Sequence, residues 1–544
     1  MTSDDQNYFK IRSQDEETAR KNLVPDNSSK GLTTLPESVL SYHGALMLDP
    51  ATAARVDGYV ATQPTAYRAA ELLLPADSPV EDINNVLGLD LGLMLEGVSG
   101  LRHRLVPDKD PERRAQRREK GTASAVRVDA WTAMQTLRSA TLEGDNRLAA
   151  HKSAIDAISL NHLLIGSAMG GIGGVSVLNG VPGAIGGNPD PGKDPGNLGY
   201  WRIPVAVQFP ATRRSVSSSR RPVIAVLDTG IGKNSWLGVV DENDLGPFVH
   251  IDQDIQKVVH SPVSDGLLDD SVDHPPTGEP LTGYLSSHTG HGTFIMGIVH
   301  QVEPDADVLS IRVMHNDGVV YEDVLHDALA ALLARVTQAQ DRWKTASDED
   351  KPEWAGRMVD VVSLSLGGYQ EEGELGAGYD KITRRIQDLH ARGVVVVASA
   401  GNYASSRPFM PAALAKRDED TPVVSVGARN PNGTKALFAN DGLWVTTWAL
   451  GAGVVSTFPE NTDGSGSPSY QVVAPNAVDE LGTRESLEVD DFRSGYAIWA
   501  GTSFAAPAVA AQIARLLRSN GLSDIGPAAT LDRARAAVKT VLQM

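Results

Sequence analysis

Five short apolar runs in the second half of the chain lack the alternation of polar and apolar residues that marks a half-exposed strand. They are Val223–Leu227, Val308–Val313, Val359–Leu366, Val394–Ala398 and Val423–Val426. Such runs are typical of parallel strands buried on both faces. Segments with helical spacing lie between them, notably Glu322–Ala339 and Tyr379–Ala391. We therefore expect an α/β fold with a mostly parallel sheet covered by helices, and functional side chains at the carboxyl ends of its strands.

The 544 residues suffice for roughly two to four domains. Residues 1–35 are polar and charged, which predicts a disordered tail. Residues 36–165 mix apolar and polar segments, and helical spacing within Ser124–Leu160 predicts a smaller, mainly helical amino-terminal region. Residues 166–221 are rich in glycine and proline and become basic toward their end, as expected of a linker. The α/β domain then occupies residues 222–544.

Composition excludes several functional classes. The formal net charge of −19 disfavours binding to nucleic acid or to anionic lipid. The absence of cysteine excludes disulfides, thiol nucleophiles and thiolate metal sites. The nearest candidate for a membrane span, Leu163–Gly187, holds nine glycines and reads as a connector. With no basic and apolar leader at the amino terminus, we expect a cytoplasmic protein without a membrane partner.

The first chemical motif is VIAVLDTG, in which an apolar strand ends at Asp228. An aspartate there could simply cap the following turn. The DTG triplet also occurs in aspartic proteases, but their chemistry needs two carboxylates that share a proton. The chain has no second DTG, and its α/β pattern does not suit that β-rich class.

The second motif is SSHTGHGTFIMGIVHQ, in which His291 lies between two glycines and precedes an apolar helical face. This spacing places an imidazole in the first turn of a helix. The nearby His288 and His300 raise a zinc site as an alternative. The motif lacks the glutamate of an HExxH site, and His300 lies nine positions beyond His291, so zinc is the weaker interpretation.

The third motif is GYAIWAGTSFAAPAVAAQIARLL, in which small residues surround Ser503 at the start of a helical pattern. A serine there commonly caps a helix. The small neighbours Gly501, Ala505 and Ala506 would also leave room for a substrate to reach the hydroxyl.

Together these motifs resemble the subtilisin-like serine protease family over about residues 222–517, in the order Asp228, His291, Ser503 and in the texts DTG, GHGT and GTSFAAP. The resemblance implies a three-layer fold and a serine endopeptidase that cleaves polypeptide through an acyl-enzyme. Ser503 would be the nucleophile and His291 the base, with Asp228 orienting the imidazole. In VVVVASAGN, Asn402 stands where the family's oxyanion asparagine falls, although an asparagine after Ala-Gly could also only form a turn.

The resemblance further implies that the substrate pairs as an extended strand. Ser365, Leu366 and Gly367 would line the subsite before the cleaved bond, and Gly318 and Val319 the outer subsites. An ordinary place in the sheet core is an equal alternative for Val319. The chemistry needs no cofactor. Some relatives bind structural calcium, but the chain has no EF-hand pattern, so no calcium ligand is assigned.

Residues 36–165 do not resemble a compact protease propeptide. They could form a permanent regulatory domain that binds a partner protein, or an inhibitory segment removed near the basic stretch 212–221; retention is favoured. Two other functions remain as alternatives. The fold could be a catalytically silent pseudoprotease that binds peptides or assembles with partners, or it could use the same residues for peptide ligation or ester hydrolysis.

Overall fold

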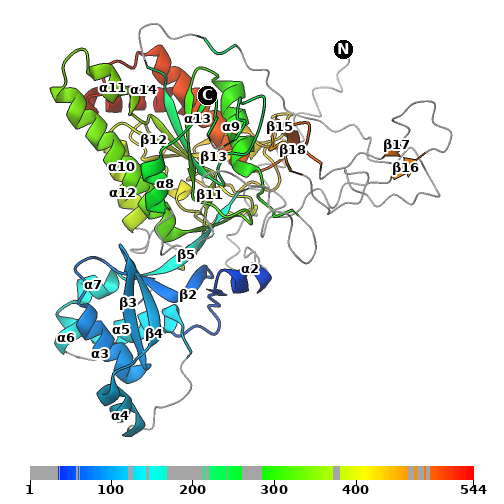
Figure 1. The fold of residues 1–544 in the computed structure, drawn as a ribbon. Helices are drawn as coiled ribbons and strands as arrows, with labels where there is room; N and C mark the ends of the chain where they lie inside the picture. The colour runs from blue at the N-terminus through cyan, green and yellow to red at the C-terminus, as the bar shows by residue number, and fades with distance from the viewer. Residues whose placement is uncertain are drawn as a thin grey trace, which may run out of the picture.

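The computed structural model describes residues 35, 37–56, 59, 62–119, 127–142, 146–167, 212–214, 220–241, 243–259, 285–371, 380–462, 471–473, 483–485 and 491–543. The expected tail therefore lies outside the described residues except for Leu35, and so does most of the expected linker. The described residues form two parts that lie one above the other in Figure 1.

The larger part is built on a seven-stranded sheet in which every neighbouring pair is parallel. Its spatial order is β14-β13-β12-β10-β6-β8-β7. The strands are β6 (Val223–Asp228), β7 (Val249–Ile251), β8 (Asp307–Arg312), β10 (Val361–Leu364), β12 (Val395–Ser399), β13 (Val423–Arg429) and β14 (Thr447–Leu450). Each of the five apolar runs contains a strand of this sheet, which confirms the predicted α/β class.

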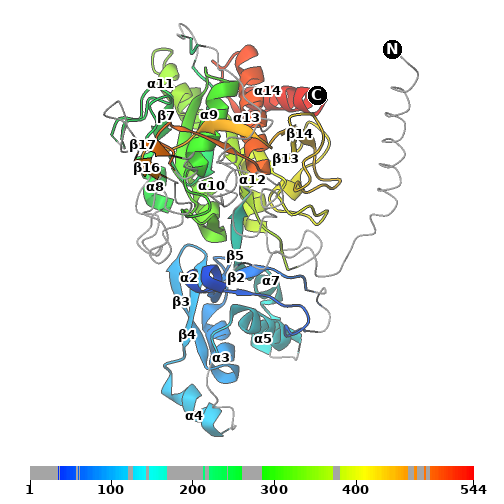
Figure 2. The ribbon, with the colours of Figure 1, turned by 90° about the vertical axis from the view of Figure 1, so that its right-hand side faces the viewer.

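Helices cover both faces of the sheet, because successive side chains of a strand point to opposite sides. Ile224 and Val226 pack with residues of α9 (His291–Val302), α13 (Thr502–Ser519) and α14 (Pro527–Leu542). Ala225 and Leu227 pack instead with residues of α8 (Gln253–Val259), α10 (Glu322–Thr345) and α12 (Asp380–Ala391). The result is the expected three-layer arrangement, visible from two sides in Figures 1 and 2.

Shorter elements complete this part. They are α11 (Lys351–Gly356), the 3₁₀ turn η5 (Ala412–Leu414) and two antiparallel ribbons, β15 (Val454–Thr457) with β18 (Tyr496–Trp499) and β16 (Gln471–Val473) with β17 (Thr483–Glu485). Two further short strands, β9 (Val319–Tyr321) and β11 (Leu366–Gly367), do not join the parallel sheet.

The amino-terminal part is organised around an antiparallel sheet of order β5-β2-β4-β3. Its strands are β2 (Ala66–Leu73), β3 (Leu93–Ser99), β4 (Arg102–Pro107) and β5 (Ser159–Gly166), with β1 (Ala45–Met47) beside β2. Its helices are α2 (Glu37–Tyr42), α3 (Val80–Asp90), α4 (Pro111–Glu119), α5 (Ala130–Leu142), α6 (Asn146–Ala149) and α7 (Lys152–Asp156). The prediction of a mainly helical region was thus incomplete, because it missed the sheet that α3 and α5 pack against.

Strand β5 connects the two parts. Near Ser159 it pairs with β2, and farther along it pairs antiparallel with β9 on one side and β11 on the other. The amino-terminal sheet therefore continues directly into the larger part (Figure 1). The last described residue of this segment, Ser167, lies at the carboxyl edge of the parallel sheet, where β6 and β12 end.

The basic residues before β6 are bound to the larger part. Arg220 makes two hydrogen bonds of 2.6 Å to the carboxylate of Asp360. The backbone N–H and Nε of Arg214 each donate to Asp305 at 2.7 Å. These contacts tie the described ends of the 212–221 stretch to the surface of the α/β domain, which argues against a freely accessible cleavage site at those ends.

Candidate active site

Asp228 and His291 form a buried hydrogen-bonded pair. Asp228 is the last residue of β6, and His291 is the first residue of α9. Asp228 Oδ1 lies 2.7 Å from His291 Nδ1, and both side chains are buried. Because an ionised carboxylate only accepts hydrogen bonds, Nδ1 carries the proton in this pair, which leaves Nε2 with a lone pair.

Backbone contacts between the two motifs hold this pair in place. The N–H of Gly292 donates to Thr229 Oγ1 at 2.9 Å, and the N–H of Gly232 donates to Thr293 Oγ1 at 2.8 Å. A Cβ atom on Gly292 would lie 2.2 Å from the carbonyl oxygen of Gly230. The glycine after His291 is therefore required for the close approach of α9 to the DTG turn.

Ser503 lies in the first turn of α13, next to this pair. The rings of Phe504 and Trp499 lie 5.4 and 5.6 Å from the imidazole of His291, measured between centroids. Ser503 Oγ donates to the carbonyl oxygen of Ser365 at 3.1 Å. His291 Nε2 has no hydrogen-bond partner among the described residues. In this state the hydroxyl is hydrogen-bonded to Ser365 and not to the base, so proton transfer would require it to exchange this hydrogen bond for one to His291.

Asn402 and Ser503 both donate to one carbonyl oxygen. The backbone N–H of Ser503 lies 3.1 Å from the oxygen of Ser167, and Asn402 Nδ2 donates to the same atom. The amide of Asn402 is oriented by Thr502, whose N–H and Oγ1 each donate to Asn402 Oδ1 at 2.9 Å. Two fixed donors thus converge on Ser167 as the donors of an oxyanion hole do.

All five residues predicted to bind substrate lie against β5. Leu366 pairs with Gly166, Gly367 with Ile165, and Val319 with Ile165 on the other side. The carbonyl oxygen of Gly318 accepts from the N–H of Gly166 at 2.8 Å. The carbonyl oxygen of Ser365 accepts from the N–H of Ser167 at 3.0 Å. The chain's own β5 therefore lies between the two segments predicted to bind substrate, here called the cleft walls, in the position expected of an extended polypeptide.

A buried charged cluster anchors β5 to the cleft walls. His162 Nδ1 lies 2.6 Å from Glu322 at the start of α10, and its Nε2 lies 2.6 Å from Glu371. Burial alone would lower the pKa of His162, but attraction to Glu371 and Glu322 outweighs it and raises the pKa to about 10. With a carboxylate at each nitrogen, His162 is an imidazolium that joins both walls to β5.

Sequence reasoning missed the cleft-filling role of β5. We placed Gly166 and Ser167 at the start of a connector because glycine is frequent after them. The available signal was the apolar run Leu163–Ile165, but Asn161 and His162 precede it, so the segment lacks the continuous apolar stretch that identified the five buried strands. No local sequence motif marks His162, because its partners Glu322 and Glu371 lie 160 and 209 positions away in the sequence.

The zinc and aspartic-protease alternatives do not fit this arrangement. Asp228 pairs with an imidazole rather than a second carboxylate. His300 packs between the rings of Trp236 and Phe248, at 4.6 and 4.7 Å, away from His291. Within the described ranges no three His, Cys, Asp or Glu side chains are grouped as metal ligands, so a calcium site is not assigned there. The helices that the structure describes include none with the length and apolar character to span a bilayer.

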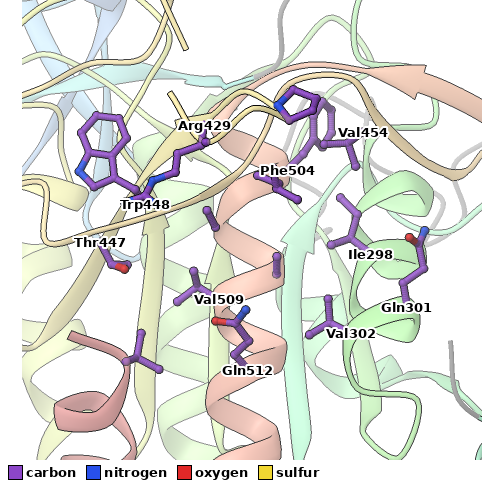
Figure 3. Close-up of a pocket in the computed structure, with 16 residues that line it drawn as sticks. Ile298, Gln301, Val302, Arg429, Thr447, Trp448, Val454, Phe504, Val509 and Gln512 are labelled. Carbon is purple, nitrogen blue, oxygen red and sulfur yellow. The ribbon is translucent and has the colours of Figure 1, made fainter. Parts of the chain in front are cut away.

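A separate cavity of about 370 Å³ lies along α13, between this helix and α9 (Figure 3). Val509 and Gln512 of α13 line one side, and Ile298 and Val302 of α9 line another. Asp228, His291 and Ser503 do not line it. Phe504 does, and the same ring contacts the imidazole, so this cavity borders the back of the site rather than the cleft.

Comparison with known proteins gives consistent matches. A family model described as the subtilase family matches residues 219–540. Subtilisin DY from Bacillus licheniformis is 28% identical over 180 residues, which cover 33% of this chain and 57% of that protein. Subtilisin BL from Lederbergia lenta is 30% identical over 186 residues, covering 34% and 58%. A thermophilic serine proteinase from Bacillus sp. (strain AK1) is 25% identical over 302 residues, covering 56% and 53%. The chain thus spans somewhat more than half the length of these relatives.

Proposed function

This chain belongs to the subtilase family, and from that premise we propose that it is a serine endopeptidase that hydrolyses polypeptide through Asp228, His291, Ser503 and Asn402. The observation that supports this most strongly is the Ser167 carbonyl group. It is held by the Ser503 N–H and the Asn402 amide at the end of an extended strand, beside the Asp228–His291 pair.

In the first half of the proposed reaction, His291 Nε2 accepts the proton of Ser503, and Oγ attacks the substrate carbonyl carbon. Negative charge then gathers on the carbonyl oxygen, where the Ser503 N–H and Asn402 Nδ2 stabilise it. Asp228 holds the imidazole in the required tautomer and stabilises the imidazolium. The amide C–N bond breaks as His291 returns the proton to the leaving amine, and the acyl group remains on Ser503.

In the second half, water loses a proton to His291 and attacks the acyl carbon. The second tetrahedral adduct uses the same two donors. Its collapse returns the proton to Ser503 Oγ and releases the carboxylic acid product. Each step uses groups of the chain, so the proposed chemistry requires no cofactor. A stabilising calcium ion stays a prediction from the family resemblance, and thermal unfolding with and without a chelator would test it.

The amino-terminal part supplies the first substrate in this proposal. Its β5 fills the cleft and places the carbonyl group of Ser167 at the reacting position, so the full chain is a self-inhibited precursor that cleaves itself after Ser167. This replaces our sequence-based preference for a permanently retained domain. It also moves the cleavage point away from the 212–221 stretch, in which Arg214 is bound to Asp305 and Arg220 to Asp360.

The test compares the purified full chain with its Ser503→Ala variant. We expect the wild type to yield a product whose amino terminus is Ala168, and the variant to remain intact. A fluorophosphonate probe should label the wild type at Ser503 after cleavage. A wild-type chain that stays intact and resists the probe would instead favour a silent peptide-binding module. Product analysis with a competing amine separates hydrolysis from ligation.

A further inference from the structure

The Gly166 position in the cleft has no space for a side chain. Gly166 immediately precedes Ser167, whose carbonyl group is held by the two oxyanion-hole donors. A Cβ atom on Gly166 would lie 2.7 Å from both Cδ2 and Nε2 of His288, and 3.0 Å from Met314 Sδ. Cβ atoms in proteins essentially never approach other atoms within 3.0 Å. The thioether of Met314 is flexible and could shift, so His288 is the group that decides what fits.

His288 is held from behind and cannot withdraw. A Cβ atom on Gly318 would lie 2.3 Å from His288 Nδ1, which means that the Gly318 backbone packs directly against the opposite side of the ring. Nδ1 also lies 3.0 Å from the hydroxyl of Ser287, which donates to the carbonyl oxygen of Asp317 at 3.0 Å. The backbone N–H of His288 donates to Asn316 at 2.8 Å, and the side chain is fully buried.

The imidazole of His288 is also neutral. Burial, followed by the neighbouring His291, lowers the pKa of His288 to about 3. The contact between the His288 ring and Gly166 therefore does not change with protonation over the pH range in which a histidine can act as the catalytic base. His288 excludes a side chain at position 166 through the space that its ring fills, and not through a charge.

The neighbouring subsite is narrow as well. The Cδ1–Cε1 edge of the Phe409 ring lies close to the backbones of both Gly367 and Gly401, since Cβ atoms on these glycines would lie 2.3 and 3.1 Å from its carbons. Phe409 is itself buried. The subsite predicted beside Gly367 is thus bordered by a large buried ring, consistent with the small side chain of Ser167 directly after β5.

We propose that His288 is a specificity-determining residue that admits only glycine at the second position before the cleaved bond. The substrates are then polypeptides with glycine followed by a small residue at the cut, as in Ile165–Gly166–Ser167 of the chain itself. This inference rests on the proposed endopeptidase activity and adds to it a substrate class that the catalytic residues alone do not define.

The first test uses self-cleavage of the full chain in a cycle of variants. Gly166→Ala should slow cleavage after Ser167 by roughly 10- to 100-fold, as expected for forcing a methyl group into a packed site. Gly166→Ala combined with His288→Ala should restore cleavage, because the smaller side chain accommodates the methyl group. Gly97→Ala in β3 is the matched control; a Cβ atom there would lie 3.7 Å from the nearest atom, on His103, so cleavage should stay within a few-fold of wild type.

A second test needs no variant of the enzyme. Synthetic peptides of residues 160–171 carrying Gly or Ala at position 166 are offered to the self-processed wild type. The Gly peptide should be cut after Ser167 and the Ala peptide at least about 10-fold more slowly. Equal cleavage of both, with Ser503 labelled by the fluorophosphonate probe, would overturn the assignment of His288 while leaving the protease proposal intact. Failure to cut either peptide, with no labelling, would refute the protease proposal itself.

Discussion

The backbone N–H of Ser503 lies 3.1 Å from the carbonyl oxygen of Ser167, so the nucleophile's own residue holds the carbonyl group of an internal strand. Asn402 Nδ2 donates to the same oxygen. The two residues come from segments that are 336 and 235 positions beyond Ser167 in sequence, and the parallel sheet brings them to one edge. This relationship makes the oxyanion donors the most direct part of the site to test.

Replacing Asn402 with Ala should slow self-cleavage by roughly 10²–10³, the scale known for subtilisin's own oxyanion-hole donor rather than one worked out for this chain. The amide contributes a neutral donor where charge develops, and alanine removes it. The rate is measured by following the full chain on gels after refolding. Asn402→Asp is the matched control: it keeps an acceptor for Thr502 but cannot donate while ionised, so it should be equally slow. A fast Asp variant would show that the donor is not needed.

The His162 anchor predicts a pH dependence of stability. The pKa of His162 is raised to about 10 when β5 is docked, above its ordinary value of 6.5. The docked state therefore binds the proton more tightly, and its stabilisation is complete below about pH 6.5 and lost as pH rises toward 10. In a Ser503→Ala background, the free energy of unfolding in urea should fall over this range by at most about 1.4 kcal/mol per pH unit from this group.

The control for this prediction is His162→Gln in the same background. Glutamine is neutral at every pH, so the stability difference between the two proteins should shrink steadily as pH rises. Parallel curves for the two proteins would show that the imidazolium is not what couples β5 to Glu322 and Glu371.

Gly292 offers a test of how the two motifs are joined. A Cβ atom there would lie 2.2 Å from the Gly230 carbonyl oxygen, so Gly292→Ala should push α9 away from the DTG turn and misplace His291. We expect self-cleavage to fall by at least about 10-fold, together with about 1–3 kcal/mol of destabilisation. Gly356 at the end of α11 has open space around it, so Gly356→Ala is the matched control and should leave cleavage unchanged. Full activity in the Gly292→Ala protein would show that the DTG turn can shift to make room for the added methyl group.

The sheet of the α/β domain was predictable because strands that are buried on both faces consist of continuous runs of apolar residues. The short edge strand β14 was not predictable, because its side chains are partly exposed and its sequence, TWAL, is not a continuous apolar run. The amino-terminal sheet was missed for a related reason. β3 and β4 mix buried and exposed positions irregularly, so neither strict alternation nor a continuous apolar run marks them.

The candidate catalytic residues could be named because each sits in a local motif of adjacent residues. The groups that shape the cleft could not. His288 reaches its role only through contacts with Gly166 and Gly318, and Phe409 through contacts with Gly367 and Gly401. Such roles depend on which backbone segments approach one another, and single-sequence patterns carry no information on that approach.

The basic stretch before β6 gives a last prediction, on stability. Arg220 and Asp360 form a bidentate ion pair, and their side chains are only 7% and 5% exposed. Asp360 also accepts a hydrogen bond from the backbone N–H of Val223 at 2.9 Å. Arg220→Ala would leave a buried carboxylate without its cation, which should cost about 3–5 kcal/mol of unfolding free energy. Arg214 is the matched control: its side chain is 65% exposed, so Arg214→Ala should cost no more than about 1 kcal/mol. Urea unfolding of both variants in the Ser503→Ala background measures the contrast, and similar losses would show that the Arg220 pair does not anchor the start of the domain.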